Sequence, residues 1–513
     1  MIDPTDVSPA LQILLLAVLA VPILGAIVVA LLPARLDRGA RIVATAFAAV
    51  TFVAAVLLAL PSSRDFGWFD YTGSGMPPVI PWAEVDLPWV PSLGIEFHIG
   101  VDGVSYPLVV LTGLLTLLCC AYTVWKVPTG GSGRTLAALL LVLEAGILGT
   151  FLALDLVLFF VFFEVVLLPM YAVIAGWGGP ERRRAARKFV LYTLFGSVLL
   201  LLGVFTVVAS ADTGDVTVLT GGHGLSRTTQ HVAFALFAVA FAVKAPLWPL
   251  HTWLPDAHTE APTVGSVILA GVLLKMGTYG LIRIGVGVAP QGAAWAAPAL
   301  GILATAAIIA GSLVCLRQTE LKRLIAYSSV GHMGFVLLGI ATLTATGVQA
   351  ALIGNVAHGV ITGLLFFLAG AIKDRAHTGD LTALGGLRET APRLAGLLGF
   401  AAIASLGLPG LAGFWGEAFA VVAAIQRGSP LWTTLAVVAA VGGALTATYF
   451  LRLLRRVTHG PAVEAVTGFP AISRAEWLAW APLVLLTLVV GLVPALVLAN
   501  AADPVAALTG ALP

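Results

Sequence analysis

The chain has 513 residues, of which 59% are hydrophobic and only 10% are Asp, Glu, Lys or Arg, whereas soluble proteins carry about 25% of these charged residues. This composition excludes a water-soluble fold, and a net charge of +2 provides no basic surface for binding nucleic acid. Three cysteines, Cys119, Cys120 and Cys315, form no CxxC pair and no ligand spacing typical of zinc, iron–sulfur or haem. We therefore expect no redox cofactor in this chain.

Apolar runs bounded by charges or by Gly and Pro clusters predict fourteen transmembrane segments, since about 20 apolar residues cross a bilayer core of about 30 Å. In chain order they lie near 10–32, 41–61, 103–125, 136–154, 156–176, 187–210, 230–250, 262–282, 296–316, 322–340, 346–372, 394–426, 431–451 and 478–500. The first run follows Asp3 and Asp6 and no basic residue, so we expect a span and not a cleaved signal peptide. The division at Asp155 is the least secure, and thirteen or fifteen spans remain alternatives.

The Lys and Arg residues between these segments support fourteen spans. If the loops alternate across the membrane, 21 basic residues fall on one side and four on the other, at Arg64, Arg227, Arg283 and Arg427. The long loop at 62–102 on the second side is instead acidic, with Asp65, Asp70, Glu84, Asp86, Glu96 and Asp102. Because basic loops stay on the cytoplasmic side, the pattern predicts that both termini lie outside.

Five charged residues lie within the apolar segments and not between them: Glu144, Glu164, Lys244, Lys275 and Glu417. A charge at the centre of a bilayer costs about 3 kcal/mol or more, so such residues are candidates for function. Both basic members are lysine, although the chain has 21 Arg and only six Lys. Arg does not release its proton in a protein, whereas a buried lysine can. With His332 and His358 as titratable companions, the set predicts a proton relay; the alternative is a scaffold whose charges only pair to hold helices together.

Two segments contain helix breaks close to these charges. The sequence APLWP at 245–249 follows Lys244, and GLPG at 407–410 precedes Glu417. Proline interrupts helical hydrogen bonds, and transporters place broken helices at their ion sites in corresponding positions of two repeats. The spacing predicts one five-span repeat at 136–282 and a second, inverted because five is odd, at 296–451, flanked by three spans at 1–135 and one at 452–513. The predicted fold class is an all-α polytopic membrane protein of about fourteen transmembrane helices, with helices seven and twelve broken.

Three segments resemble the antiporter-like membrane subunits of respiratory complex I, and more narrowly the M, or chain 4, subunits. They are FFEVVLLPMYAVIAGWG at 162–178, HTWLPDAHTEAPT within the stretch from Lys244 to Arg283, and LKRLIAYSSVGHMGF at 321–335. The similarity extends from about residue 98 to 460. It implies proton translocation driven by electron transfer in other subunits of the complex, which would carry NADH, FMN, iron–sulfur clusters and quinone.

The resemblance also assigns roles to the buried residues. Glu164 would pair with Lys244 on broken helix seven, and Lys275 would be the central relay group. His332 and His358 would continue the path, and Glu417 on broken helix twelve would be its outer end; Glu144 matches the family less uniformly. The implied partners are membrane lipid and the other membrane-arm subunits, especially the L and N types, in a bacterial plasma membrane.

The alternative assignment is a subunit of a multi-subunit sodium/proton antiporter. Such subunits, and the L and N types, generally have Lys where Glu417 stands. A further cluster, His251, Asp256, His258 and Glu260, imitates a metal site, but its spacing fits no standard ligand pattern. We expect these four residues to cap helices or contact neighbouring subunits. Trp68, Trp82 and Trp89 are typical of membrane-interface belts.

Overall fold

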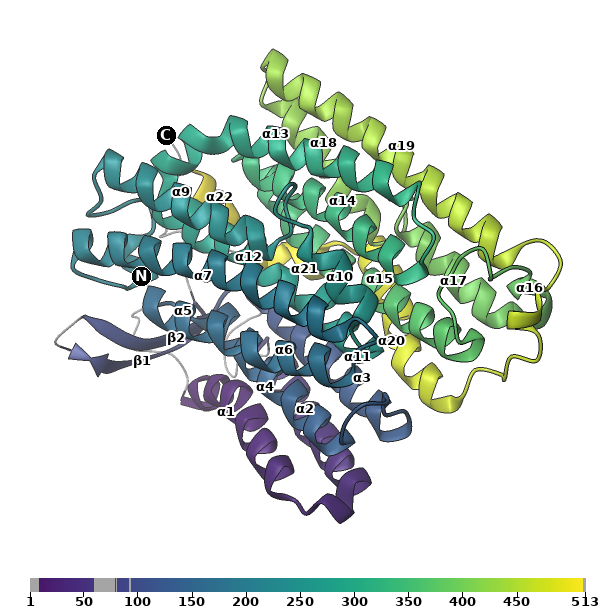
Figure 1. Ribbon diagram of the computed structural model, residues 1–513. Helices are drawn as coiled ribbons and strands as arrows, with labels where there is room; N and C mark the ends of the chain where they lie inside the picture. The colour runs from purple at the N-terminus through teal and green to yellow at the C-terminus, as the bar shows by residue number, and fades with distance from the viewer. Residues whose placement is uncertain (1–8, 60–78, 80, 92–93, 511–513) are drawn as a thin grey trace.

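The computed structural model describes residues 9–59, 79, 81–91 and 94–510. Figure 1 shows a bundle of helices with a small β-hairpin at its left end. In the described residues, twelve helical spans are long and apolar enough to cross a membrane. In chain order these are α1 (Pro9–Leu31), α2 (Asp37–Leu57) with the preceding η2 (Ala34–Leu36), α3 (Tyr106–Trp125), α4 (Gly133–Leu152), α5 with α6 (Leu156–Val165 and Leu167–Trp177), α7 (Arg182–Ala211), the run α11, η4, α12 and η5 (Thr263–Ile268, Leu269–Leu273, Leu274–Gly280 and Leu281–Val286), α13 (Pro290–Cys315), α14 (Leu321–Ala341), α15 (Ala345–Ala376), α19 (Pro430–Thr458) and α20 (Arg474–Leu492).

The two remaining predicted spans are the broken ones. The segment near 230–250 forms α9 (Arg227–Lys244), and the chain leaves the helix before starting α10 (Trp253–Glu260). The segment near 394–426 is divided into α17 (Pro392–Ala404) and α18 (Gly413–Gln426). Both interruptions coincide with the predicted Pro and Gly clusters. The shorter elements are α8 (Val216–Leu219), α16 (Leu387–Thr390), η6 (Glu464–Val466), α21 (Ala495–Leu498), η7 (Ala499–Ala501) and α22 (Ala502–Gly510).

Two predicted boundaries have clear physical outcomes. Asp155 does separate two helices, because its Oδ1 accepts hydrogen bonds from the N–H groups of Val157 and Leu158 at 2.8 and 2.9 Å and so caps α5. The last span was predicted to reach residue 500, which is wrong. It ends at Leu492, because Pro494 disfavours helical geometry in the residue before it.

The predicted all-α class is confirmed, and the structure adds a two-stranded sheet that was not predicted. Strands β1 (Ala83–Val90) and β2 (Ile95–Val101) pair antiparallel within the predicted acidic loop, with Asp86 opposite His98. Ala83, Ile99 and Val101 are buried on one face, so apolar burial together with cross-strand pairing stabilises the hairpin. Arg64, Asp65, Trp68 and Asp70 of that loop lie outside the described residues.

One turn occurs twice, with the same hydrogen bonds, at opposite ends of the bundle. The sequences TGDVT at 213–217 and TGDLT at 378–382 place Asp215 and Asp380 165 residues apart, the same offset as from Asp155 to Glu320. Asp155 forms a backbone bridge with Asp215, and Glu320 forms one with Asp380. In each copy, the residue after the first carboxylate donates its N–H to the glycine carbonyl at 2.8 Å. A pair of inverted repeats would produce this arrangement.

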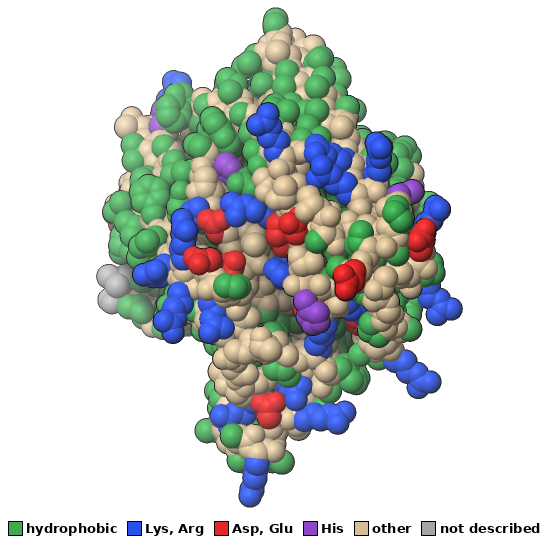
Figure 2. All heavy atoms as spheres, turned by 45° about the vertical axis from the view of Figure 1, so that its right-hand side comes forward, with side chains coloured by type: hydrophobic (Ala, Val, Ile, Leu, Met, Phe, Trp, Pro, Cys, Tyr) green, Lys and Arg blue, Asp and Glu red, His purple; other side chains and the backbone are tan. Residues whose placement is uncertain are grey.

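The second copy of the turn lies at the end of the bundle that is rich in Lys and Arg, which we call the basic side; the end that carries the hairpin is the hairpin side. Figure 2 turns the α16 side of the molecule toward the viewer and shows Lys and Arg side chains spread over it, with Asp and Glu among them. Asp256 there contacts both Lys188, at 2.7 Å, and Arg323, at 3.3 Å. Between the two sides, the run from α11 to η5 is buried at every residue from Val264 to Val286.

Candidate functional site

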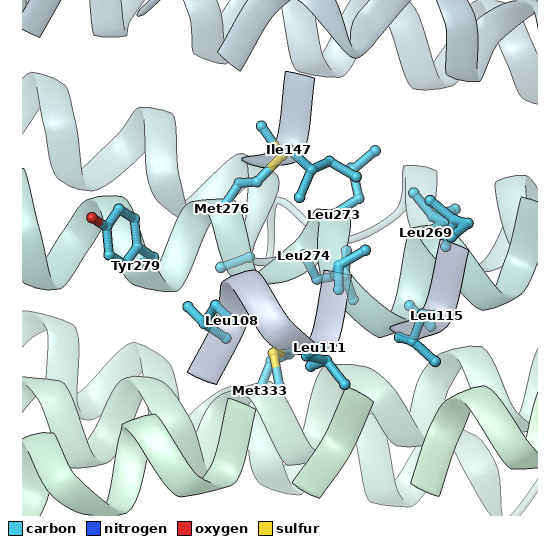
Figure 3. Packing of buried hydrophobic residues seen from close by; sticks show 14 of the residues in the cluster. Leu108, Leu111, Leu115, Ile147, Leu269, Leu273, Leu274, Met276, Tyr279 and Met333 are labelled. Atoms are coloured by element: carbon cyan, nitrogen blue, oxygen red, sulfur yellow. The ribbon is translucent and has the colours of Figure 1, made fainter. Parts of the chain in front are cut away.

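Lys275 lies at the centre of the bundle on α12 and is completely buried. Its Nζ donates a hydrogen bond to the carbonyl of Ala270 at 2.5 Å and lies 2.7 Å from Nδ1 of His358 on α15. The helix that carries it is π-helical on both sides, in η4 and η5, and such wide turns are frequent at functional sites. Figure 3 shows apolar side chains of neighbouring helices, among them Leu108, Leu111 and Ile147, close to Leu274 and Met276 of this helix. The packing excludes bulk water from the amine.

A second contact extends the path from His358. The imidazole rings of His358 and His332, which lies on α14, are 5.9 Å apart between centroids and meet edge to face. His332 Nδ1 is 2.6 Å from Oε1 of Glu417 on α18. Lys275, His358, His332 and Glu417 therefore form one series of neighbouring titratable groups across four helices. The ring-to-ring step is the only one of the three without a direct contact.

A cavity of about 30 Å³ lies beside that step. Both histidines and Glu417 line it, together with Val336, Ala357 and other residues of α14, α15 and α18. Nε2 of each histidine is buried and has no hydrogen-bond partner among the described residues. A water molecule needs about 10–15 Å³ and two or more polar partners, so the cavity has both the volume and the polar groups to hold one.

The break between α17 and α18 positions Glu417. Gly407 and Gly410 adopt left-handed backbone angles, with φ of +68° and +89°, which favour glycine. A Cβ at Gly407 would lie 3.0 Å from Oε2 of Glu417, so a side chain at this position would press on the carboxylate. Glu417 retains 16% of its side-chain exposure, consistent with a group at the end of a path.

The expected ion pair between Glu164 and Lys244 is not formed in the structure. Lys244 is buried at the end of α9, with Nζ 4.5 Å from the centroid of the Phe163 ring. Glu164, on α5, instead accepts a hydrogen bond from the hydroxyl of Ser197 on α7. The aromatic face stabilises the ammonium, and the hydroxyl stabilises the carboxylate. Each charge has therefore found a partner other than the predicted one.

A close helix crossing connects Lys244 to the central series. A Cβ at Gly277, two residues after Lys275, would lie 2.7 Å from the backbone N of Ala245 and 2.8 Å from the carbonyl of Phe241. Only glycine lets α12 approach the end of α9 this closely. The crossing brings the helices that carry Lys244 and Lys275 into backbone contact.

Glu144 lies apart from the series of Lys275, His358, His332 and Glu417. It is completely buried on α4, and neither of its carboxylate oxygens has a hydrogen-bond partner among the described residues. No contact joins it to another predicted site residue in the described part of the chain. Its place in a path stays a prediction.

The prediction that Arg283 and Asp102 lie in exposed loops is wrong. Their side chains form an ion pair at 2.5 Å and are only 4% and 3% exposed. Asp102 Oδ1 also accepts from two backbone N–H groups at 3.0 Å, and Arg283 donates to the Tyr279 hydroxyl at 3.3 Å. Lys322 is another charge assigned to a loop that proves buried, donating to the carbonyl of Ala261 at 2.9 Å. These residues stand next to apolar runs, which was the only sequence signal of their burial.

The four residues that imitated a metal site do not converge. Asp256 pairs with the basic residues described above, and Glu260 Oε2 accepts from the backbone N–H of Glu181 at 2.9 Å, just before α7. His258 stacks on Phe366, with centroids 4.4 Å apart. The bond of Glu260 holds the residue that precedes the first turn of α7, and the expected helix-capping role stays a prediction. A larger, open depression of about 700 Å³ near Arg375 and Glu476 does not include any of the predicted site residues.

Comparison with known proteins identifies the family. Residues 153–443 match the family model described as NADH:quinone oxidoreductase/Mrp antiporter, TM. The NADH-quinone oxidoreductase subunit M of Rhodobacter capsulatus is 41% identical over 474 residues, covering 90% of this chain and 88% of the relative. The NAD(P)H-quinone oxidoreductase chain 4 1 of Nostoc sp. is 38% identical, covering 94% of this chain and 88% of the relative.

Solved structures agree with this assignment. A chain of respiratory complex I from Thermus thermophilus with bound NADH superposes with a TM-score of 0.84 and 30% identity, covering 98% of this chain and all of that one. The Mrp complex from Dietzia sp. shares the fold, with a TM-score of 0.80 and 24% identity, covering 97% of this chain and 52% of that one. The chain therefore belongs to the NADH:quinone oxidoreductase/Mrp antiporter membrane family and, within it, to the M, or chain 4, subunits of NADH-quinone oxidoreductase.

Proposed function

We propose that this chain is a proton-translocating subunit in the membrane arm of NADH-quinone oxidoreductase and moves protons through Lys275, His358, His332 and Glu417. The series of these four groups, with contacts of 2.7 and 2.6 Å at its two ends, carries the proposal. Lysine, histidine and glutamate each bind and release a proton. A water molecule in the cavity between the histidines would complete the series by hydrogen bonding to both Nε2 atoms.

Glu164 and Lys244 act as the switch that loads this series. When the pair closes, each charge stabilises the other; when it opens, the ammonium of Lys244 gives up its proton more easily. Two unit charges about 4 Å apart at an effective dielectric constant near 20 interact by about 4 kcal/mol. Moving one proton against 100 mV requires about 2.3 kcal/mol. Opening one ion pair is therefore strong enough to drive the transfer. The contacts of Lys244 with Phe163 and of Glu164 with Ser197 correspond to the open state.

Electron transfer takes place in other subunits, and this chain catalyses no bond chemistry of its own. NADH, FMN, iron–sulfur clusters and quinone would bind to those subunits. The neighbouring membrane-arm subunits of the L and N types would couple the opening and closing of the switch to electron transfer in the redox subunits. The chain would lie in a bacterial plasma membrane with its basic side toward the cytoplasm and both termini outside. Glu417 then delivers protons toward the outer side, and residues 136–282 and 296–451 act as the two inverted repeats.

The test uses the assembled complex in inverted membrane vesicles. Glu417→Gln keeps the shape of the side chain but removes its proton, so NADH-driven proton pumping should fall while the complex still assembles. Glu464→Gln, a change in the partly exposed η6 segment far along the chain from the relay, should pump like the unmodified protein. Unchanged pumping by the Glu417→Gln complex would show that protons leave the path through another residue.

The second candidate is a subunit of a sodium/proton antiporter, favoured by the fold it shares with the Mrp complex. Co-purification separates the two, since only the first assignment places the chain with NADH- and flavin-binding subunits. The scaffold alternative makes a different prediction. Neutralising Lys244 and Glu164 together would then leave pumping intact, whereas the switch predicts its loss.

A further inference from the structure

A second polar contact between α12 and α15 lies one helical turn from the contact of Lys275 with His358. The hydroxyl of Thr278 donates a hydrogen bond to Oδ1 of Asn355 at 2.9 Å. Thr278 follows Lys275 by three residues on α12. Asn355 precedes His358 by three residues on α15, so both contacts belong to one antiparallel register of the two helices. Thr278 and Asn355 are completely buried.

On the other side of Lys275, the same two helices approach each other through glycine. A Cβ at Gly359 would lie 2.6 Å from the carbonyl oxygen of Gly271, so a side chain at this position would force the helices apart. The glycine crossing sets their distance, but it provides no side chain that fixes their rotation. Because π-helical turns lie on both sides of Lys275, the rotation is not set by a regular α-helix. A hydrogen bond is directional, and the bond between Thr278 and Asn355 is placed to fix this rotation.

The chemistry of the second contact differs from that of the first. Lys275 and His358 change charge as a proton passes, and they repel each other when both carry one. The hydroxyl and the amide stay uncharged throughout. Their contact therefore holds the two helices together in every protonation state of the relay.

Asn355 is a costly choice for a residue that only fills space. Its Nδ2 is buried and has no hydrogen-bond partner in the part of the chain that the structure describes, and an unsatisfied buried donor destabilises a fold. Two apolar side chains of similar shape would pack without that cost. A buried polar contact instead specifies one arrangement of the helices around it.

We propose that Thr278 and Asn355 are positioning residues, which hold Lys275 in register with His358 while a proton passes between them. The inference rests on the proposed function, in which Lys275 and His358 are consecutive members of the relay. The alternative is a packing role alone. The two roles predict opposite results for one pair of substitutions at Thr278.

Thr278→Val keeps the shape of the side chain and removes its hydroxyl, whereas Thr278→Ser keeps the hydroxyl and removes a methyl group. In inverted vesicles, NADH-driven pumping per assembled complex should fall about 2–10-fold with Thr278→Val, the loss expected for one net hydrogen bond. Thr278→Ser should recover that loss. The matched control is Thr487→Val, which should pump like the unmodified complex. Thr487 is also completely buried, but its hydroxyl bonds the Leu483 carbonyl of its own helix at 2.8 Å.

Equal pumping by the Thr278→Val and Thr278→Ser complexes would overturn the proposal. So would slower pumping with serine than with valine, which is the result that packing alone predicts. If Thr278→Val leaves Asn355 unpaired and does not assemble, the double variant Thr278→Val, Asn355→Leu replaces both partners with apolar side chains and should assemble. It should also pump about 2–10-fold more slowly, and pumping at the unmodified rate would refute the positioning role.

Lys275→Arg in the same assay separates this inference from the proposed function. If Lys275→Arg stops pumping and Thr278→Val does not slow it, the relay stands and the positioning role is wrong. If Lys275→Arg pumps at the unmodified rate, the relay itself is wrong, and the positioning role is wrong with it.

Discussion

The step between His358 and His332 allows a test that leaves every titratable group in place. Ala357 is buried on α15 and lines the cavity of about 30 Å³ beside the two rings. The substitution Ala357→Val adds two methyl groups to this space and should exclude water from it. Because the rings are 5.9 Å apart between centroids, the water molecule proposed to bridge their Nε2 atoms would then have no space.

The expected effect follows from the two nitrogens that lose a hydrogen-bond partner. An unsatisfied buried polar group costs about 1–3 kcal/mol, so the two together raise the barrier by about 2–6 kcal/mol. Since about 1.4 kcal/mol corresponds to a tenfold change in rate, proton transfer should slow about 30-fold or more. The two added methyl groups also overpack the core, which costs about 1–3 kcal/mol of folding stability. Assembly of the complex must therefore be checked.

The assay compares NADH oxidation with proton pumping in inverted vesicles, after native electrophoresis has established that the complex is intact. The matched control is Val336→Ala, which enlarges the same cavity and should keep pumping at the unmodified level. If the assembled Ala357→Val complex pumps at the unmodified rate, water in this cavity is not part of the path and the reasoning fails.

Three further changes address the other steps of the path. Lys275→Arg keeps the charge but cannot release the proton, so pumping should stop while the complex still assembles; pumping near the unmodified rate would exclude Lys275 as a carrier. Ser197→Ala removes a hydrogen bond to the Glu164 carboxylate worth about 1.5–3 kcal/mol, which should shift the Glu164–Lys244 pair toward its closed form by at least about tenfold and slow pumping accordingly. Gly277→Val brings a Cβ to 2.7 Å from backbone and should lower the yield and melting temperature of the complex by forcing α12 away from α9; normal yield and stability would contradict the crossing.

These variants have internal controls in the same chain. Lys126→Arg keeps the exposed ion pair with Asp374, which is 2.6 Å long, and tests whether a lysine-to-arginine change is tolerated in general. Thr206→Ala removes a hydroxyl from α7, the helix of Ser197, but that hydroxyl bonds only a carbonyl of its own helix at 2.7 Å. If Thr206→Ala slows pumping as much as Ser197→Ala does, the effect belongs to α7 and not to Glu164.

Composition and periodicity predicted the parts of the molecule that the bilayer dictates. Apolar length determines a span, and clusters of Pro and Gly interrupt helices, so the breaks near Lys244 and Glu417 were visible in the sequence. Single prolines do not have this effect here, since Pro22, Pro298 and Pro482 lie inside α1, α13 and α20. Burial of Arg283 and Asp102 was not, because hydropathy treats a charge beside an apolar run as a boundary. Whether Arg283 is solvated or paired depends on Asp102, which lies 181 residues earlier in the chain.

Contacts between predicted residues were harder to foresee than the residues themselves. The buried position of Lys275 followed from its sequence neighbours, but its contact with His358 depends on how α12 and α15 are rotated. The pairing of Glu164 with Lys244 was an implication of the family resemblance, and in the structure Ser197 contacts Glu164 and Phe163 contacts Lys244 instead. The hairpin was missed although AEVDLPWV and IEFHIGV alternate apolar and polar residues, as strands do. Apolar runs of about 20 residues predict membrane spans but do not reveal this shorter period.

Because π-helical turns lie on both sides of Lys275, the direction of its side chain depends on how many residues those turns contain. Each residue turns an α-helix by about 100°, and a π-turn accommodates one residue more than an α-turn does. Deleting a single residue within η4 would therefore rotate everything after it by about 100° and point the amine away from His358, although no side chain of the path had changed. The direction in which the Lys275 side chain points therefore depends on the number of residues in the helix as well as on their chemistry. A search for functional variants in this chain should include one-residue deletions between Leu269 and Leu273.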